Sequence, residues 1–77
     1  MAANYGEKLI KLGLNIAYYR KLKLLSQEEL AEKINISRPY MSKIEAPNMY
    51  ASFSLKLLCK IADALEVSES KLFDFRD

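Results

Sequence analysis

The 77-residue chain contains no histidine and no tryptophan, and Cys59 is its single cysteine. Without histidine, it cannot form a His-ligated zinc site, a Ser-His-Asp triad or a Cys-His pair. One cysteine allows neither an internal disulfide nor a cysteine-based metal site, so we expect no metal or cofactor and a buried, hydrophobic role for Cys59. With no glycine-rich phosphate loop either, the sequence argues against an enzyme.

Long apolar runs and targeting signals are also missing. No stretch approaches the ~20 apolar residues that span a bilayer, and the first residues do not form a basic segment followed by an apolar core. We therefore expect no membrane association and a reducing, cytoplasmic location. The chain has only two glycines and two prolines, so turn signals are sparse and helices are favoured.

The composition that is present fits one globular domain. Hydrophobic residues make up 51% of the chain and charged residues 29%, which is not the balance of a disordered tail. A domain of this length buries roughly 60% of the surface of its unfolded chain, so it is marginal alone and gains from dimerisation. The net charge of +2 only weakly favours a nucleic-acid partner.

Apolar residues recur at helical spacing in five segments, which predicts an all-α, five-helix orthogonal bundle over residues 1–77. The expected helices cover about 4–23, 27–34 and 38–45, then a segment after Ser54, and a short segment from Val67-Ser68 with Leu72 and Phe73 inward. Gly13 costs the first helix roughly 1 kcal/mol relative to alanine, which indicates a close helix contact there.

Serine residues mark the expected helix starts. Ser26, with Glu29 three residues later, forms the pattern of a capping box. Ser37 is the next candidate cap. Pro39 follows in the first turn of that helix, where its missing N–H does no harm.

The two short helices within residues 27–45 are the informative feature. Helices below about 12–15 residues are marginal in water, so both must pack on their neighbours. Two such helices joined by a tight turn form a helix-turn-helix, whose second helix can enter the ~12 Å major groove of DNA. In that second helix Met41 and Ile44 are predicted to face the core. Its outward side carries Ser37, Arg38, Pro39, Tyr40, Ser42 and Lys43.

These outward side chains suit contacts with DNA. Arg38 can donate a bidentate pair to guanine, Ser42 can donate or accept, and the Pro39 ring can touch a thymine methyl. Ser37 and the amides at the helix start suit a phosphate oxygen. The alternative is an ordinary solvated helix face, since arginine, serine and lysine are common on such surfaces, and composition alone does not decide between the two.

Two sequence strings favour the DNA-binding interpretation over an ordinary solvated face. They are Ser-Gln-Glu-Glu-Leu-Ala at 26–31 and Ser-x-Ile-Glu at 42–45. At this spacing, and over about residues 9–73, the chain resembles the phage repressor and Cro (Xre-like) family of helix-turn-helix regulators. Further matching positions are Gly13, Ile16, Arg20, Ile36-Ser37-Arg38, Met41, Ser54-Leu55, Ile61-Ala62 and Leu65-Glu66-Val67. The short chain and the Arg-x-Tyr-x-Ser pattern at 38–42 also resemble restriction–modification controller proteins.

The resemblance implies a lambda-repressor-like DNA-binding domain that acts in a bacterial or phage-infected cytoplasm, at the nucleoid. It implies that Gln27, first in its helix, contacts a backbone phosphate. The implied DNA-facing set is Arg38, Pro39, Ser42 and Lys43, with Tyr40 beside it. Arg20 and Glu45 match a pair that forms a salt bridge between the first and third helices. We assign Arg20 mainly to positioning, since removing one partner of a buried pair costs about 3–5 kcal/mol, with a phosphate contact as its alternative role.

The resemblance further implies a homodimeric transcriptional regulator on double-stranded DNA. Two-fold symmetry would place half-sites about one turn (~34 Å) apart on a pseudo-palindromic operator. Dimer-interface candidates, which can equally be core, are Leu65, Val67, Leu72, Phe73 and Phe75. The alternative function is a protein-interaction or antitoxin-like module without DNA reading. Glu28, Glu29 and Glu32 form either a surface for RNA polymerase or a solvated face.

The loop at residues 46–53 departs from the family pattern. Pro47 ends the preceding helix near Glu45, because the residue before a proline avoids helical geometry. The family usually has glycine and then basic residues here, but this loop holds no lysine or arginine, which puts the usual loop–phosphate contact in doubt. Asn48 can supply a left-handed turn, and an apolar knob that packs on the core or on a partner can form from Met49, Tyr50 and Phe53.

Overall fold

The computed structural model describes residues 5–47 and 53–75. These residues form five helices and no strand: α1 Tyr5–Leu22, α2 Gln27–Ile34, α3 Arg38–Glu45, α4 Leu55–Leu65 and α5 Glu69–Leu72. The all-α prediction is confirmed, and α1, α2 and α3 match their expected ranges to within one residue at each end. Within these ranges no helix is both long enough and apolar enough to span a membrane.

Serine caps determine where the helices begin. The hydroxyl oxygens of Ser26, Ser37 and Ser54 each accept from the backbone N–H three residues on, at 3.0, 3.2 and 3.1 Å. The Glu29 carboxylate in turn accepts from the backbone N–H of Ser26 at 2.8 Å, which completes the predicted capping box. Ser68 occupies the N-cap of α5 but makes no side-chain capping bond. The caps at Ser26, Ser37 and Ser54 satisfy amides that a helix start leaves unpaired.

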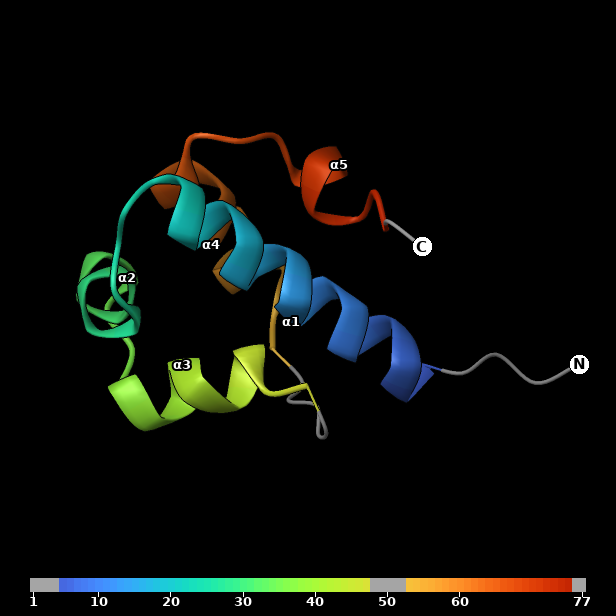
Figure 1. The fold of residues 1–77 in the computed structure, drawn as a ribbon, viewed down its shortest axis with the longest axis horizontal. Coiled ribbons are helices and arrows are strands. Elements are labelled where there is room, and N and C mark those ends of the chain that lie inside the picture. The colour runs from blue at the N-terminus through green and yellow to red at the C-terminus, as the bar shows by residue number, and fades with distance from the viewer. Residues whose placement is uncertain (1–4, 48–52, 76–77) are drawn as a thin grey trace, which may run out of the picture.

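The helices surround α1, which runs through the centre of the view in Figure 1, with α3 below it and α5 above. α1 contacts α3, α4 and α5, and α2 packs on α3 and α4. The larger buried side chains are Leu12, Ile16, Leu30, Ile34, Met41, Ile44, Leu58, Ile61, Leu65 and Leu72. They come from all five helices, so the two short helices α2 and α3 are held by a shared core.

Gly13 lies where α1 crosses α3. A Cβ atom at this position would collide with the backbone carbonyl oxygen of Ile44 and approach the Cα of Glu45. The close contact expected from this glycine is therefore confirmed, and it is a contact of backbone with backbone. It fixes α3 against α1 at a distance that no larger residue permits.

Asn15 joins α5 to α1. Its Nδ2 donates to the carbonyl oxygen of Leu72 at 2.8 Å and to that of Asp74 at 3.2 Å, and only 5% of the residue is exposed. Sequence reasoning gave this residue no role, although its helical position between Leu12 and Tyr19 borders the core face. A buried amide that satisfies two carbonyl oxygens fixes the short C-terminal helix more specifically than Leu72 alone could.

Two burial predictions were wrong. Cys59 is exposed, because it follows Leu58 by one residue and so points about 100° away from the core face of α4. Partial desolvation of its sulfur and the nearby carboxylates of Glu69 and Asp63 raise the pKa of the Cys59 thiol. Phe73 is 51% exposed, because α5 ends at Leu72 and the next side chain no longer follows the helical stripe.

The loop predictions are met in part. Phe53 is half-buried and packs against the core. Asn48, Met49 and Tyr50, for which a left-handed turn and an apolar knob were expected, lie outside the described residues. The core therefore receives at least one aromatic side chain from this segment, immediately before α4.

Candidate nucleic-acid interface

The helix α3 has two faces of different character. Met41, Ile44 and Glu45 are buried. The exposed residues are Ser37 at the cap, Arg38, Pro39, Ser42 and Lys43, while Tyr40 is half-buried beside them. The exposed face carries two basic side chains and no acidic one. The residues expected to contact DNA, Gln27 aside, thus lie along one side of a single helix, and the core residues hold the other side.

The turn between α2 and α3 sets the angle between the two helices. Asn35 adopts the left-handed conformation (φ 62°), and its N–H returns to the carbonyl oxygens of Ala31 and Glu32. The N–H of Ile36 also reaches the carbonyl oxygen of Ala31, at 2.9 Å, and its side chain packs against the core. Asparagine tolerates this conformation better than most residues, so three residues suffice to reverse the chain.

A buried ion pair fixes the far end of α3. Arg20 and Glu45 form a bidentate pair, with Nε to Oε2 at 2.8 Å and a guanidinium NH₂ to Oε1 at 2.9 Å. Arg20 also donates to the carbonyl oxygen of Leu25 at 2.7 Å. Both charged residues are less than 10% exposed. The salt bridge expected from the sequence therefore forms, and it joins α1, the α1–α2 loop and α3.

Gln27 belongs to the same network. Its Nε2 donates to Glu45 Oε1 at 2.9 Å, so the first residue of α2 is tied to the last residue of α3. Sequence reasoning missed this contact, because nothing in the spacing of 27 and 45 shows that they meet. Since an amide carries two N–H bonds, the contact leaves a phosphate bond by Gln27 chemically possible.

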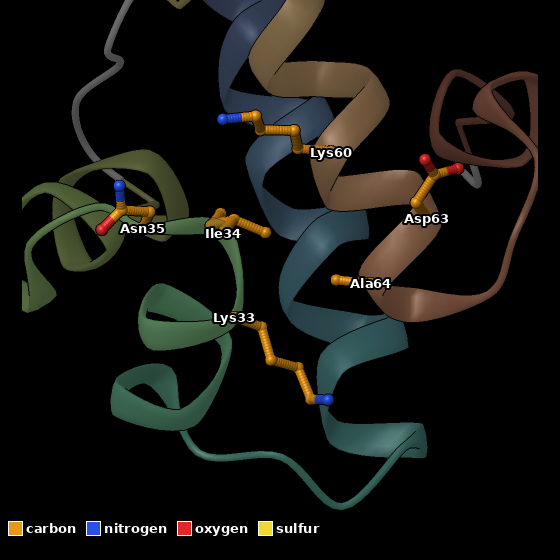
Figure 2. Close-up of a pocket in the computed structure, with 6 residues that line it drawn as sticks. All are labelled: Lys33, Ile34, Asn35, Lys60, Asp63 and Ala64. Atoms are coloured by element: carbon orange, nitrogen blue, oxygen red, sulfur yellow. The ribbon is translucent and has the colours of Figure 1, made fainter.

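A shallow hollow of about 420 Å³ lies between α2 and α4 (Figure 2). Its lining residues are Lys33, Ile34, Asn35, Lys60, Asp63 and Ala64. None of them belongs to α3. In Figure 2 the amino groups of Lys33 and Lys60 point in different directions rather than toward one point. The hollow therefore lacks the converging polar groups of a small-molecule site and lies apart from the exposed face of α3.

The dimer candidates divide into two groups. Leu65 and Leu72 are 0% exposed within a single chain, so of the two roles that the sequence left open they have that of core residues. Val67 and Phe75 are partly buried against the core, and Phe73 is half-exposed. The rings of Phe73 and Phe75 lie 6.3 Å apart between centroids. Of the five candidates, only these three retain surface that a partner could cover.

Comparison with known proteins supports the helix-turn-helix arrangement of α2 and α3. The family model described as helix-turn-helix matches residues 16–72. The HTH-type transcriptional regulator SinR of Bacillus subtilis is 40% identical over 63 residues, which cover 82% of this chain and 56% of that protein. This chain thus spans little more than half the length of that relative.

Solved structures agree over most of the chain. The restriction-modification controller protein C.AhdI from Aeromonas hydrophila has a TM-score of 0.76 and 34% identity, covering 84% of this chain and 96% of that one. The structure of SinR, the master regulator for biofilm formation, in complex with DNA has a TM-score of 0.73 and 40% identity, covering 82% and 98% of the two chains. The controller protein C.Esp1396I has a TM-score of 0.74 and 36% identity, covering 87% and 84%.

Proposed function

The chain belongs to the helix-turn-helix family, in its Xre-like branch with the lambda-repressor-like fold, and from this premise we propose that it is a transcriptional regulator that binds double-stranded DNA through α3. The observation that carries the proposal is the exposed face of α3. Arg38, Ser42 and Lys43 share that face with no carboxylate among them. The relative SinR, whose solved structure contains DNA, supports it.

We assign the roles within α3 from the chemistry of its exposed side chains. Arg38, at the first position, is the side chain that reads a base, through paired hydrogen bonds to guanine. Pro39 and Ser42 add apolar and hydroxyl contacts, and Tyr40 flanks them. Ser37, Gln27 and Lys43 position the helix by contacting phosphates. Met41, Ile44 and the ion pair at Glu45 keep α3 in place, so that its entry into the groove requires no rearrangement.

The regulator acts as a homodimer on a pseudo-palindromic operator. Two copies related by two-fold symmetry place their α3 helices in successive major grooves, about 34 Å apart. The dimer surface is the end of the chain after α4, where Val67, Phe73 and Phe75 retain exposed area. Selection of bound sequences from random duplex DNA tests this arrangement. A fixed half-site spacing supports it, and recovery of no preferred sequence favours the alternative, a protein-interaction module.

Arg38→Ala tests the role of α3 most directly. The variant should lose about 1–3 kcal/mol of binding free energy on the selected operator and lose preference at one base pair, because a bidentate contact to guanine is removed. Fluorescence anisotropy at two salt concentrations measures both the affinity and its salt dependence. Lys60→Ala, which removes an exposed charge on α4 away from the α3 face, is the matched control and should retain specificity. Unchanged specificity in Arg38→Ala would refute the assignment.

A further inference from the structure

The short helix α5 depends on other parts of the chain for its position. It has four residues, Glu69–Leu72, and Ser68 at its N-cap makes no side-chain capping bond. Of these four residues only Leu72 is buried. A helix of this length is not stable by itself, so contacts from outside α5 decide where it lies and where the chain goes after it. The helix α1, which lies beside α5 in Figure 1, supplies one of these contacts.

Asn15 of α1 holds the backbone on both sides of Phe73. Its Nδ2 donates to the carbonyl oxygen of Leu72 at 2.8 Å and to that of Asp74 at 3.2 Å. Phe73 lies between these two residues, at the point where the chain leaves α5 with φ −93° and ψ 0°. Because only 5% of Asn15 is exposed, water cannot take the place of its amide without a rearrangement. The amide therefore fixes the turn that directs the Phe73 side chain.

The turn that Asn15 fixes brings two aromatic side chains together near the surface. Phe73 is 51% exposed, Phe75 is partly buried against the core, and their ring centroids lie 6.3 Å apart. Asp74, whose carbonyl oxygen accepts from Asn15, directly precedes Phe75. One buried amide thus controls the backbone from which both rings project. Aromatic side chains grouped in this way are typical of the centre of a protein–protein interface.

We propose that Asn15 is the positioning residue of the dimer surface and holds Phe73 and Phe75 in the arrangement that a second copy of the chain binds. The proposal rests on the homodimer of the proposed function, in which these two rings belong to the contact. The α3 face is positioned by other residues of α1, namely Gly13 and Arg20. A change at Asn15 should therefore weaken dimerisation and leave the reading of a single DNA half-site intact.

Sedimentation equilibrium without DNA tests the role of Asn15. Asn15→Leu keeps a side chain of similar size that cannot donate a hydrogen bond, so it should weaken dimerisation about tenfold. Asn15→Ser, whose hydroxyl is too short to reach both carbonyl oxygens, should weaken it in the same direction. Ile34→Val is the control, because it removes a buried methyl group from α2 and leaves the bonds to α5 in place. A folded Asn15 variant that dimerises within about twofold of the parent, or a parent that stays monomeric, would overturn the proposal.

Binding to a duplex that holds one half-site of the selected operator separates this role from DNA reading. Fluorescence anisotropy should give Asn15→Leu an affinity for that duplex within about twofold of the parent. At concentrations where the free protein is monomeric, its affinity for the full operator should fall about tenfold, in step with dimerisation. Equal losses on the two duplexes would overturn the positioning role, because they would show a general loss of folded protein. If the parent bound neither duplex, the DNA-binding proposal would fail, while sedimentation would still report on Asn15.

Discussion

At a few positions of α1, a contact with another helix restricts which side chain the fold accepts, and the adjacent residues in the sequence give no sign of that contact. Gly13 is the clearest case, because the Cβ of any other residue would meet the carbonyl oxygen of Ile44. Asn15 and Arg20 are two further buried residues of α1 whose polar atoms have fixed partners, on α5 and α3 respectively. These three residues position α1 against α3 and α5.

Gly13→Ala should destabilise the protein although alanine favours helix. The added methyl group has to displace the backbone of α3, so the cost of overpacking lies toward the upper end of its usual range, about 3 kcal/mol, against the roughly 1 kcal/mol gained in helix propensity. Thermal unfolding followed by circular dichroism measures the change. Gly6→Ala, in the first turn of the same helix, adds the same methyl group and is the control that should not lower Tm. A Gly13→Ala protein as stable as the parent would contradict the close contact.

At the scale of elements, the short helices depend on their ends. α2 and α3 have eight residues each, too few to be stable alone, and each begins at a serine whose hydroxyl accepts a backbone N–H. In α2 the Glu29 carboxylate also accepts from the N–H of Ser26, and this hydrogen bond lowers the pKa of Glu29. The α2–α3 pair is therefore stabilised at its starts by local contacts and along its length by the core.

The capping box should make the stability of α2 depend on pH. Because the pKa of Glu29 is lower in the folded chain than its ordinary value of 4.5, its contribution is fully present above that value and is lost as the pH falls through the folded pKa. Urea unfolding of the parent and of Glu29→Gln should therefore differ at pH 7 and converge in strongly acidic solution. Ser26→Ala should cost about 1 kcal/mol at pH 7. A difference between parent and Glu29→Gln that did not change with pH would exclude this role.

At the scale of the whole molecule, one buried carboxylate joins three parts of the chain. Glu45 accepts from Arg20 of α1 and Gln27 of α2, and it ends α3. Because Arg20 also donates to the carbonyl oxygen of Leu25, the loop between α1 and α2 is tied to the same point. The orientation of the exposed α3 face relative to the rest of the molecule therefore depends on this network as well as on apolar packing.

Arg20→Met should destabilise the protein by about 3–5 kcal/mol, since it leaves the Glu45 charge buried without its ionic partner. The double variant Arg20→Met/Glu45→Leu should recover a large part of the loss, because no buried charge remains. Urea denaturation of the two single variants and the double variant forms a double-mutant cycle. Strictly additive losses would show that the two side chains do not act as a pair.

The sequence by itself determined the helices and the exposed side of α3. Serine caps mark where α2 and α3 begin, and apolar spacing separates Met41 and Ile44 from the outward Arg38. These features depend on residues within one or two turns of each other, so local rules suffice to find them. The Arg20–Glu45 pair was expected as well, but only because the family resemblance supplied it.

Only the tertiary structure decided which distant residues meet. The bond from Gln27 to Glu45 and the bonds from Asn15 to the carbonyl oxygens of Leu72 and Asp74 join segments that no spacing rule connects. The exposure of Cys59 depends on which side of α4 the other helices cover. Likewise, the burial of Leu72 under α1 removed it from the dimer surface, since the same apolar side chain can be core or interface until its neighbours in space are known.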